Sequence, residues 1–128
     1  MEKKSINSQN APQPSGGYAQ AIEIQEATRT LYISGQIPVD NEGNVPKSFE
    51  EQARLAWNNI GHQLEAAGMS FDNLVKHTTF LADRQYCESN SKVRQEILGN
   101  RETTLTVIIA DIYDPAWLLE IEAIAMSN

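Results

Sequence analysis

A chain of 128 residues has the commonest size for a single domain and can bury a core without disulfides or metals. Its one cysteine excludes an intramolecular disulfide and a cysteine-based zinc cluster, and no apolar run approaches the roughly 20 residues that span a bilayer. The formal net charge of −7, with Lys and Arg scattered along the chain, argues against nucleic acid or an acidic membrane as the main partner. The polar first residues do not resemble a secretory signal, so we expect one cytoplasmic domain over residues 1–128.

The N-terminal part of the chain predicts an extended segment followed by two strands. Residues 1–17 are rich in polar residues, proline and glycine, which favours an extended segment that ends at a Gly-Gly turn. Apolar and polar residues alternate within 18–25 and again within 29–35, a pattern typical of short strands. The polar residues 25–28 have the length of a turn, so we expect these two strands to pair as a hairpin.

The middle of the chain predicts a helix and then a strand. Ser48 and Glu51 have the spacing of a capping box at a helix start, and an apolar stripe follows at intervals of three and four. Gly68 stands where a left-handed residue commonly ends a helix. The segment 74–82 is rich in residues that favour strands.

The last part predicts a second helix and two more strands. The helix follows Asp83 and ends at Gly99, and Asn90 is a polar residue on its apolar face, either a core amide or a ligand contact. Strands are predicted over 103–111 and 117–125. The order β-β-α-β-α-β-β indicates an α+β fold in which two helices cover one face of a mixed sheet.

The strand predicted over 103–111 carries apolar or β-branched side chains on both faces. Two helices cover only one face of a sheet, and a sheet that is apolar on both faces needs a second cover. No third helix is predicted, so we expect another subunit of the same chain to supply that cover.

Two acidic residues in the last strand are the first candidates for chemistry. Glu120 and Glu122 point to the same side of a strand that is otherwise apolar. A carboxylate there is costly unless it is solvated or paired, so the two lie either at a solvated edge or beside a pocket that holds water or a polar ligand. No phosphate-binding loop, dinucleotide-binding glycine motif or zinc-protease motif occurs in the chain.

Four features stand out in chain order: APQPSGGYAQA over 11–21, SGQIP over 34–38, Asn90, and EIEAIA over 120–125. Together they resemble the RidA (YjgF) family of reactive intermediate deaminases. The resemblance implies a chorismate-mutase-like fold (bacillary type) and a homotrimer whose ligand clefts lie between subunits. It also implies hydrolysis of reactive enamines or imines to ammonia and a 2-oxo acid, without a metal or an organic cofactor.

The resemblance also implies roles for individual residues. Glu120 matches the family glutamate that positions water near the imine carbon, and is the expected catalytic residue. Tyr18, Ser34, Gly35 and Asn90 match residues that line the substrate cleft.

One residue of the family pattern is absent. In members with deaminase activity an arginine grips the substrate carboxylate, and this position falls on Thr103, with the frequent family cysteine on Leu105. Arg101 lies two residues earlier, an even offset that keeps a strand residue on the same face. We therefore assign Thr103, Leu105 and Arg101 as substrate contacts and expect poor activity on 2-iminobutanoate.

Three functions remain open from the sequence. The first is a cofactor-free hydrolase or deaminase of imines or related small metabolites. The second is a trimer that binds a small metabolite without turning it over, which the absent arginine favours. The third, a ribonuclease or translation inhibitor, ranks last because the chain is acidic and lacks a basic stripe.

Overall fold

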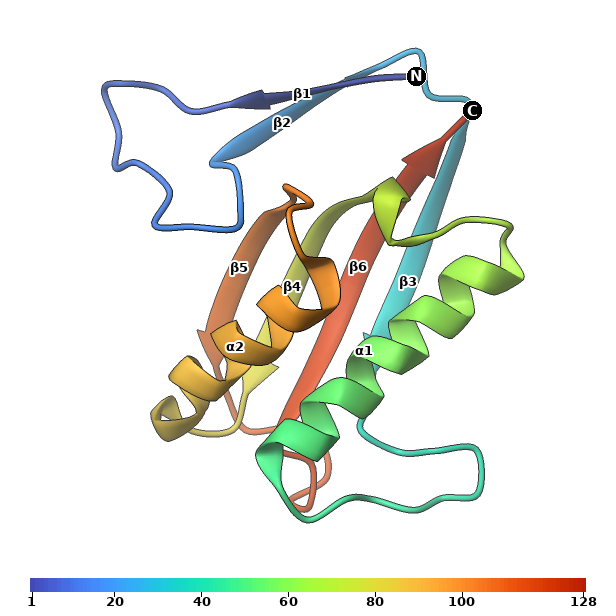
Figure 1. Cartoon of the computed structure of the whole chain (residues 1–128). Coiled ribbons are helices and arrows are strands. Elements are labelled where there is room, and N and C mark those ends of the chain that lie inside the picture. Colours follow the sequence, from blue (N-terminus) through green and yellow to red (C-terminus); the bar gives the residue numbers. More distant parts are fainter.

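The computed structural model describes residues 1–128 and consists of a four-stranded mixed sheet, two helices and a small N-terminal sheet (Figure 1). The main sheet has the order β3-β6-β4-β5, with β4 and β5 parallel and the other pairs antiparallel. Its elements are β3 (Arg29–Gln36), α1 (Phe49–Ala66), β4 (Leu74–Leu81), α2 (Cys87–Leu98), β5 (Thr104–Ile109) and β6 (Leu119–Ser127). The predicted α+β fold with two helices on one face is confirmed.

The N-terminal strands pair differently from the prediction. The strands β1 (Glu2–Ile6) and β2 (Ala21–Gln25) form a separate two-stranded antiparallel sheet, whereas β3 pairs with β6. The predicted hairpin between the second and third strands is therefore wrong, and the order gains one strand at its start. Alternation identified the two strands but carried no information about their partners, and the largely charged β1 (EKKSI) has too weak a pattern to be recognised.

The structure confirms the predicted start and end of α1 and the predicted end of α2 at Gly99. The Ser48 Oγ accepts a hydrogen bond from the Glu51 N–H at 3.2 Å, and Gly68 follows α1 with a left-handed φ of 71°. Two short 3₁₀ helices, η1 (Phe71–Asn73) and η2 (Arg84–Tyr86), were not predicted, and Asp83 caps η2 rather than α2 itself. Neither α1 nor α2 combines the length and the apolar character that crossing a membrane requires.

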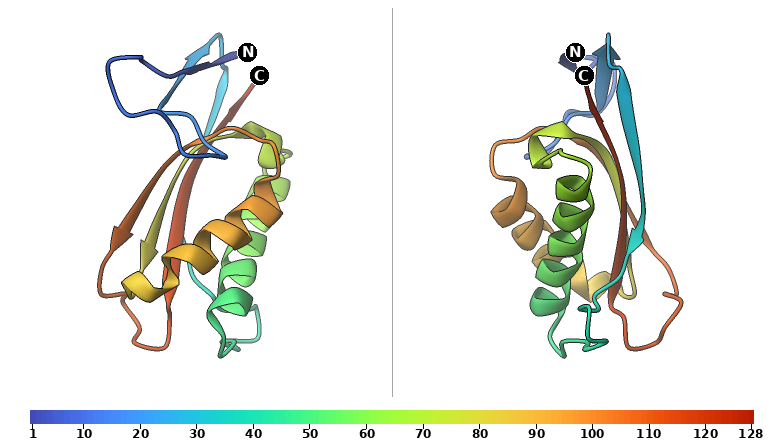
Figure 2. Two further views of the ribbon diagram at one scale, coloured as in Figure 1. Left: turned by 60° about the vertical axis from the view of Figure 1, so that its left-hand side comes forward. Right: turned by 90° about the vertical axis from the view of Figure 1, so that its right-hand side faces the viewer.

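The core lies between the helices and one face of the sheet (Figure 2). Leu119, Ile121, Ala123 and Ala125 of β6 are buried there against α1, which supplies Trp57, Ile60 and Leu64. The opposite face has no helix on it, and Tyr32 and Ile108 are 77% and 44% exposed there. This uncovered face is the one for which the sequence predicts a second subunit.

Candidate functional site

Glu120 lies against a bulge in β3. The register between β3 and β6 shifts between Ile33 and Gln36, which places Ser34 and Gly35 in the irregular stretch. A Cβ at Gly35 would lie 2.8 Å from the Glu120 Cδ and 3.0 Å from its Cγ, and closer still to Oε2. Only glycine at this position lets the carboxylate lie against the β3 backbone.

The Glu120 carboxylate is half-buried and has no partner within the chain. It forms no ion pair and accepts no hydrogen bond from another side chain or backbone N–H. An unpaired carboxylate at a partly desolvated position is available to hold and orient a water molecule or a ligand N–H. We call Ser34, Gly35 and Glu120 the β3 group.

A second set of predicted residues gathers where α2 meets the start of β5. The Ala19 N–H donates to the Thr103 carbonyl at 2.9 Å, which ties the loop carrying Tyr18 to this end of β5. Asn90 of α2 is 3% exposed, and its Oδ1 is buried without a hydrogen-bond donor. Leu105 is half-buried on the helix-covered face. We call Tyr18, Asn90, Thr103 and Leu105 the α2 group.

The two groups lie far apart in one chain. Ser34 and Gly35 lie on the edge strand β3 and Glu120 on its neighbour β6, whereas the α2 group lies at the other edge beside β5, with β4 between them. Glu120 also lies on the uncovered face, because its neighbours Leu119 and Ile121 are buried against the helices. A single chain therefore does not bring the predicted catalytic residue to the predicted cleft residues of the α2 group.

The structure assigns Thr103 and Arg101 contacts that the sequence did not indicate. Thr103 has no exposed surface, and its hydroxyl is 2.9 Å from the Nε2 of buried His77. The Arg101 Nε donates to Asp72 at 2.7 Å, and its Nη1 donates to the Leu98 carbonyl at 3.2 Å. Arg101 is thus directed toward η1 and already paired, so it does not supply a free cation beside Thr103.

Sequence reasoning missed Arg94, which lies one helical turn after Asn90 on α2. Arg94 is 8% exposed and stands beside the α2 group, where its positive charge lowers the pKa of His77. The spacing of four from Asn90 is a signal that places both residues on one helix face, and it was available in the sequence.

His77 is a neutral histidine inside the core. It is 1% exposed, its ring meets Trp57 edge to face at 5.1 Å between centroids, and its Nδ1 has no partner. Burial, with smaller contributions from the charges of Arg94 and Lys76, lowers the pKa of His77 to about 3. His77 therefore stays uncharged at neutral pH and holds Thr103 in place.

This burial predicts acid sensitivity. Below pH 6.5 the unfolded chain takes up a proton on His77 that the folded chain does not bind until the pH nears 3. We expect the free energy of unfolding to fall by up to about 1.4 kcal/mol per pH unit across this window, and His77→Thr to abolish that component. Urea unfolding between pH 7 and 4 measures it, with His62→Thr on the exposed side of α1 as the control. Equal pH slopes for wild type and His77→Thr would contradict the assignment.

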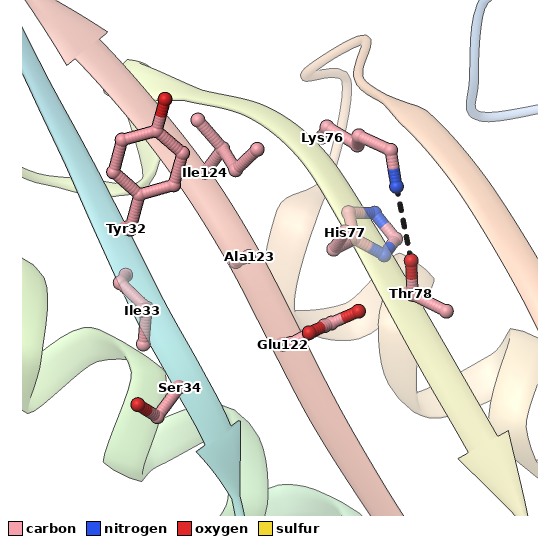
Figure 3. A pocket seen from close by; sticks show the side chains of 9 residues that line it. All are labelled: Tyr32, Ile33, Ser34, Lys76, His77, Thr78, Glu122, Ala123 and Ile124. Atoms are coloured by element: carbon pink, nitrogen blue, oxygen red, sulfur yellow. Dashed lines mark hydrogen bonds between the residues drawn. The ribbon is translucent and has the colours of Figure 1, made fainter.

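A hollow on the uncovered face borders the β3 group through Ser34 and includes no residue of the α2 group. It has a volume of about 270 Å³ and is lined by residues of β3, β4 and β6 (Figure 3). The Lys76 Nζ donates to the Thr78 Oγ1 at 3.0 Å there, and Glu122 lies nearby. Ser34 lines this hollow but Glu120 does not. No group of three or more His, Cys, Asp or Glu side chains is placed to hold a metal ion.

Known proteins are similar to this chain in sequence and in fold. The profile of the family described as endoribonuclease L-PSP matches residues 8–127. The chain belongs to the RidA (YjgF) family. A 2-iminobutanoate/2-iminopropanoate deaminase of Rattus norvegicus is 35% identical over 98% of this chain and 91% of its own length. A RutC family protein of Pyrococcus horikoshii is 36% identical over 96% of this chain and 97% of its own length.

Solved structures of RidA-family proteins have the same architecture. A Rid family protein of Yersinia pestis, YyfB, superposes with a TM-score of 0.85 at 24% identity, over 98% of this chain and 99% of that one. Escherichia coli TdcF with bound serine superposes with a TM-score of 0.74 at 29% identity, over 98% of this chain and 99% of that one. The fold of this RidA-family chain is therefore chorismate-mutase-like, as the sequence resemblance implied.

Proposed function

We propose that this chain hydrolyses small imines or enamines to ammonia and a carbonyl compound, without a cofactor. The single observation that carries the proposal is the unpaired Glu120 carboxylate held against Gly35. Water bound to this carboxylate is oriented for attack on a C=N carbon. The names of the deaminase relatives support the same reaction class.

The reaction needs only proton transfers besides the addition of water. Glu120 accepts a proton from the water as its oxygen bonds to the imine carbon, and the imine nitrogen is protonated to give a carbinolamine. The carbinolamine hydroxyl then gives its proton to the Glu120 carboxylate, the C–N bond breaks, and the electron pair leaves with the nitrogen, which takes up that proton and departs as ammonia while the carbonyl product is released. One carboxylate that holds and returns the proton satisfies this sequence.

We further propose that the working site forms between subunits of a homotrimer. The β3 group and the α2 group lie toward opposite edges of one sheet, so the β3 edge of one subunit must meet the β5 edge of the next to unite them. Repeating this head-to-tail contact generates a closed ring. The same assembly would cover the exposed face that carries Tyr32 and Ile108.

Ammonia release tests the function directly. Imines generated freshly from a panel of amino acids and amines are offered to the protein, and ammonia is measured against the rate of spontaneous hydrolysis. We expect acceleration for at least one class of imine. The hydrolase proposal fails if no imine is hydrolysed faster than it is spontaneously. If a metabolite then raises the unfolding temperature of the protein without itself being converted, the chain is a binding protein.

A further inference from the structure

Arg94 is the one cation of the chain that is buried without a partner. It is 8% exposed, yet it forms no ion pair and donates no hydrogen bond. Arg54 and Arg101, by comparison, are partly exposed and paired with carboxylates. Burying an unpaired charge is costly, so a site of this kind is completed by an anion from outside the chain.

The groups around Arg94 favour a ligand with both an anion and an N–H donor. Asn90 lies one turn earlier on the same helix face, and its buried Oδ1 lacks a donor. Hydrogen bonding by the Ser15 side chain and then by the Ser15 N–H lowers the pKa of the Tyr18 hydroxyl, and the Arg94 charge lowers it further. A Cβ at Gly17 would lie 3.9 Å from the Cγ of Gln95, the neighbour of Arg94, so this part of α2 lies beside the Tyr18 loop, which is itself hydrogen-bonded to the Thr103 carbonyl through the Ala19 N–H.

We propose that Arg94 binds the carboxylate of a small imino or amino acid, while Asn90 Oδ1 accepts a hydrogen bond from the N–H of that ligand. The planar guanidinium matches a carboxylate with two parallel hydrogen bonds. Arg94 thereby supplies from α2 the cation that is absent at Thr103, so 2-imino acids become the expected substrate class. This inference rests on the proposed function for its reaction, but the anion site itself is measured without turnover.

Calorimetric titration of the full chain tests the site with L-serine and with L-serinamide, which lacks the carboxylate. We expect wild type to bind serine at millimolar concentration, and Arg94→Met to weaken that binding by about 10-fold or more, because a hydrogen-bonded charge pair is lost. Serinamide is expected to bind at least about 10-fold more weakly than serine to wild type. Arg101→Met is the matched control and is expected to bind serine as wild type does.

Stability separates a ligand-binding role from a structural one. Arg94→Met removes a buried unpaired charge, so its unfolding temperature is expected to equal or exceed that of wild type. Serine is expected to raise the unfolding temperature of wild type and of Arg101→Met but not of Arg94→Met. Arg94→Lys keeps the charge without the planar fork, folds even if the methionine variant does not, and is expected to bind serine more weakly than wild type.

The outcomes distinguish this inference from the proposed function. The anion site would be overturned by any of three results. Wild type does not bind serine, wild type binds serinamide as tightly as serine, or both Arg94 variants bind serine as tightly as wild type does. Arg94-dependent serine binding without ammonia release from any imine would refute the hydrolase and keep the site. Release from 2-imino acids that persists in Arg94→Met would refute the site alone.

Discussion

Glu120→Gln is expected to slow ammonia release from imines by about 100- to 10,000-fold while the protein keeps its fold and assembly. Glutamine has nearly the same shape, so it fits against Gly35, but its amide cannot take up the proton that the attacking water gives up. The measurement compares initial rates of ammonia formation for purified wild type and variant on the same freshly generated imine.

Glu122→Gln is the matched control for this substitution. Glu122 lies two residues further along β6 on the same face, is exposed, and borders the hollow on the uncovered face instead of Gly35. We expect the rate of this variant to remain close to that of wild type. Equal losses in both variants, or full activity of Glu120→Gln, would remove Glu120 from the mechanism.

Two variants that are each impaired alone are expected to restore activity when they assemble together. A Glu120→Gln subunit still offers an intact α2 group with Arg94, and an Arg94→Met subunit still offers an intact β3 group. If each cleft takes one group from each of two neighbours, random assembly leaves about a quarter of the clefts intact. Co-expression of the two variants should therefore recover roughly a quarter of wild-type ammonia release on a 2-imino acid.

A second mixture controls for recovery by other routes. A side chain at position 35 would displace the Glu120 carboxylate, so Gly35→Ala also damages the β3 group. Co-expression of Gly35→Ala with Glu120→Gln leaves no subunit with an intact β3 group, and no recovery is expected. Recovery in this mixture, or none in the first, would show that the site is not shared between neighbours.

Local patterns in the sequence predicted most of the elements and part of the site. The capping residue Ser48 and the terminating glycines bound the helices because such signals act within a few residues. The period-two alternation of β6 placed Glu120 on the side opposite the buried residues. The uncovered sheet face followed from counting two helices against a sheet that is apolar on both sides.

The pairing of strands and the free cation of the site did not follow from local patterns. Alternation indicates that a strand exists, but its partner is chosen by packing between segments distant in sequence, so β3 paired with β6 instead of β2. The sequence analysis predicted Arg101 as a substrate contact and did not consider Arg94. Only the packing of α2 across the sheet shows that Arg94 faces the α2 group and that Arg101 reaches Asp72.

The sequence by itself determined the family, the α+β architecture, the candidate carboxylate Glu120 and the absence of arginine at Thr103. These properties rest on residue identity and on short-range periodicity, and both can be read directly from the sequence. The tertiary structure decided that the β3 group and the α2 group stand toward opposite edges of the sheet and that Arg94 is buried without a partner. Both depend on strand order and on the docking of α2, which arise from contacts between residues far apart along the chain.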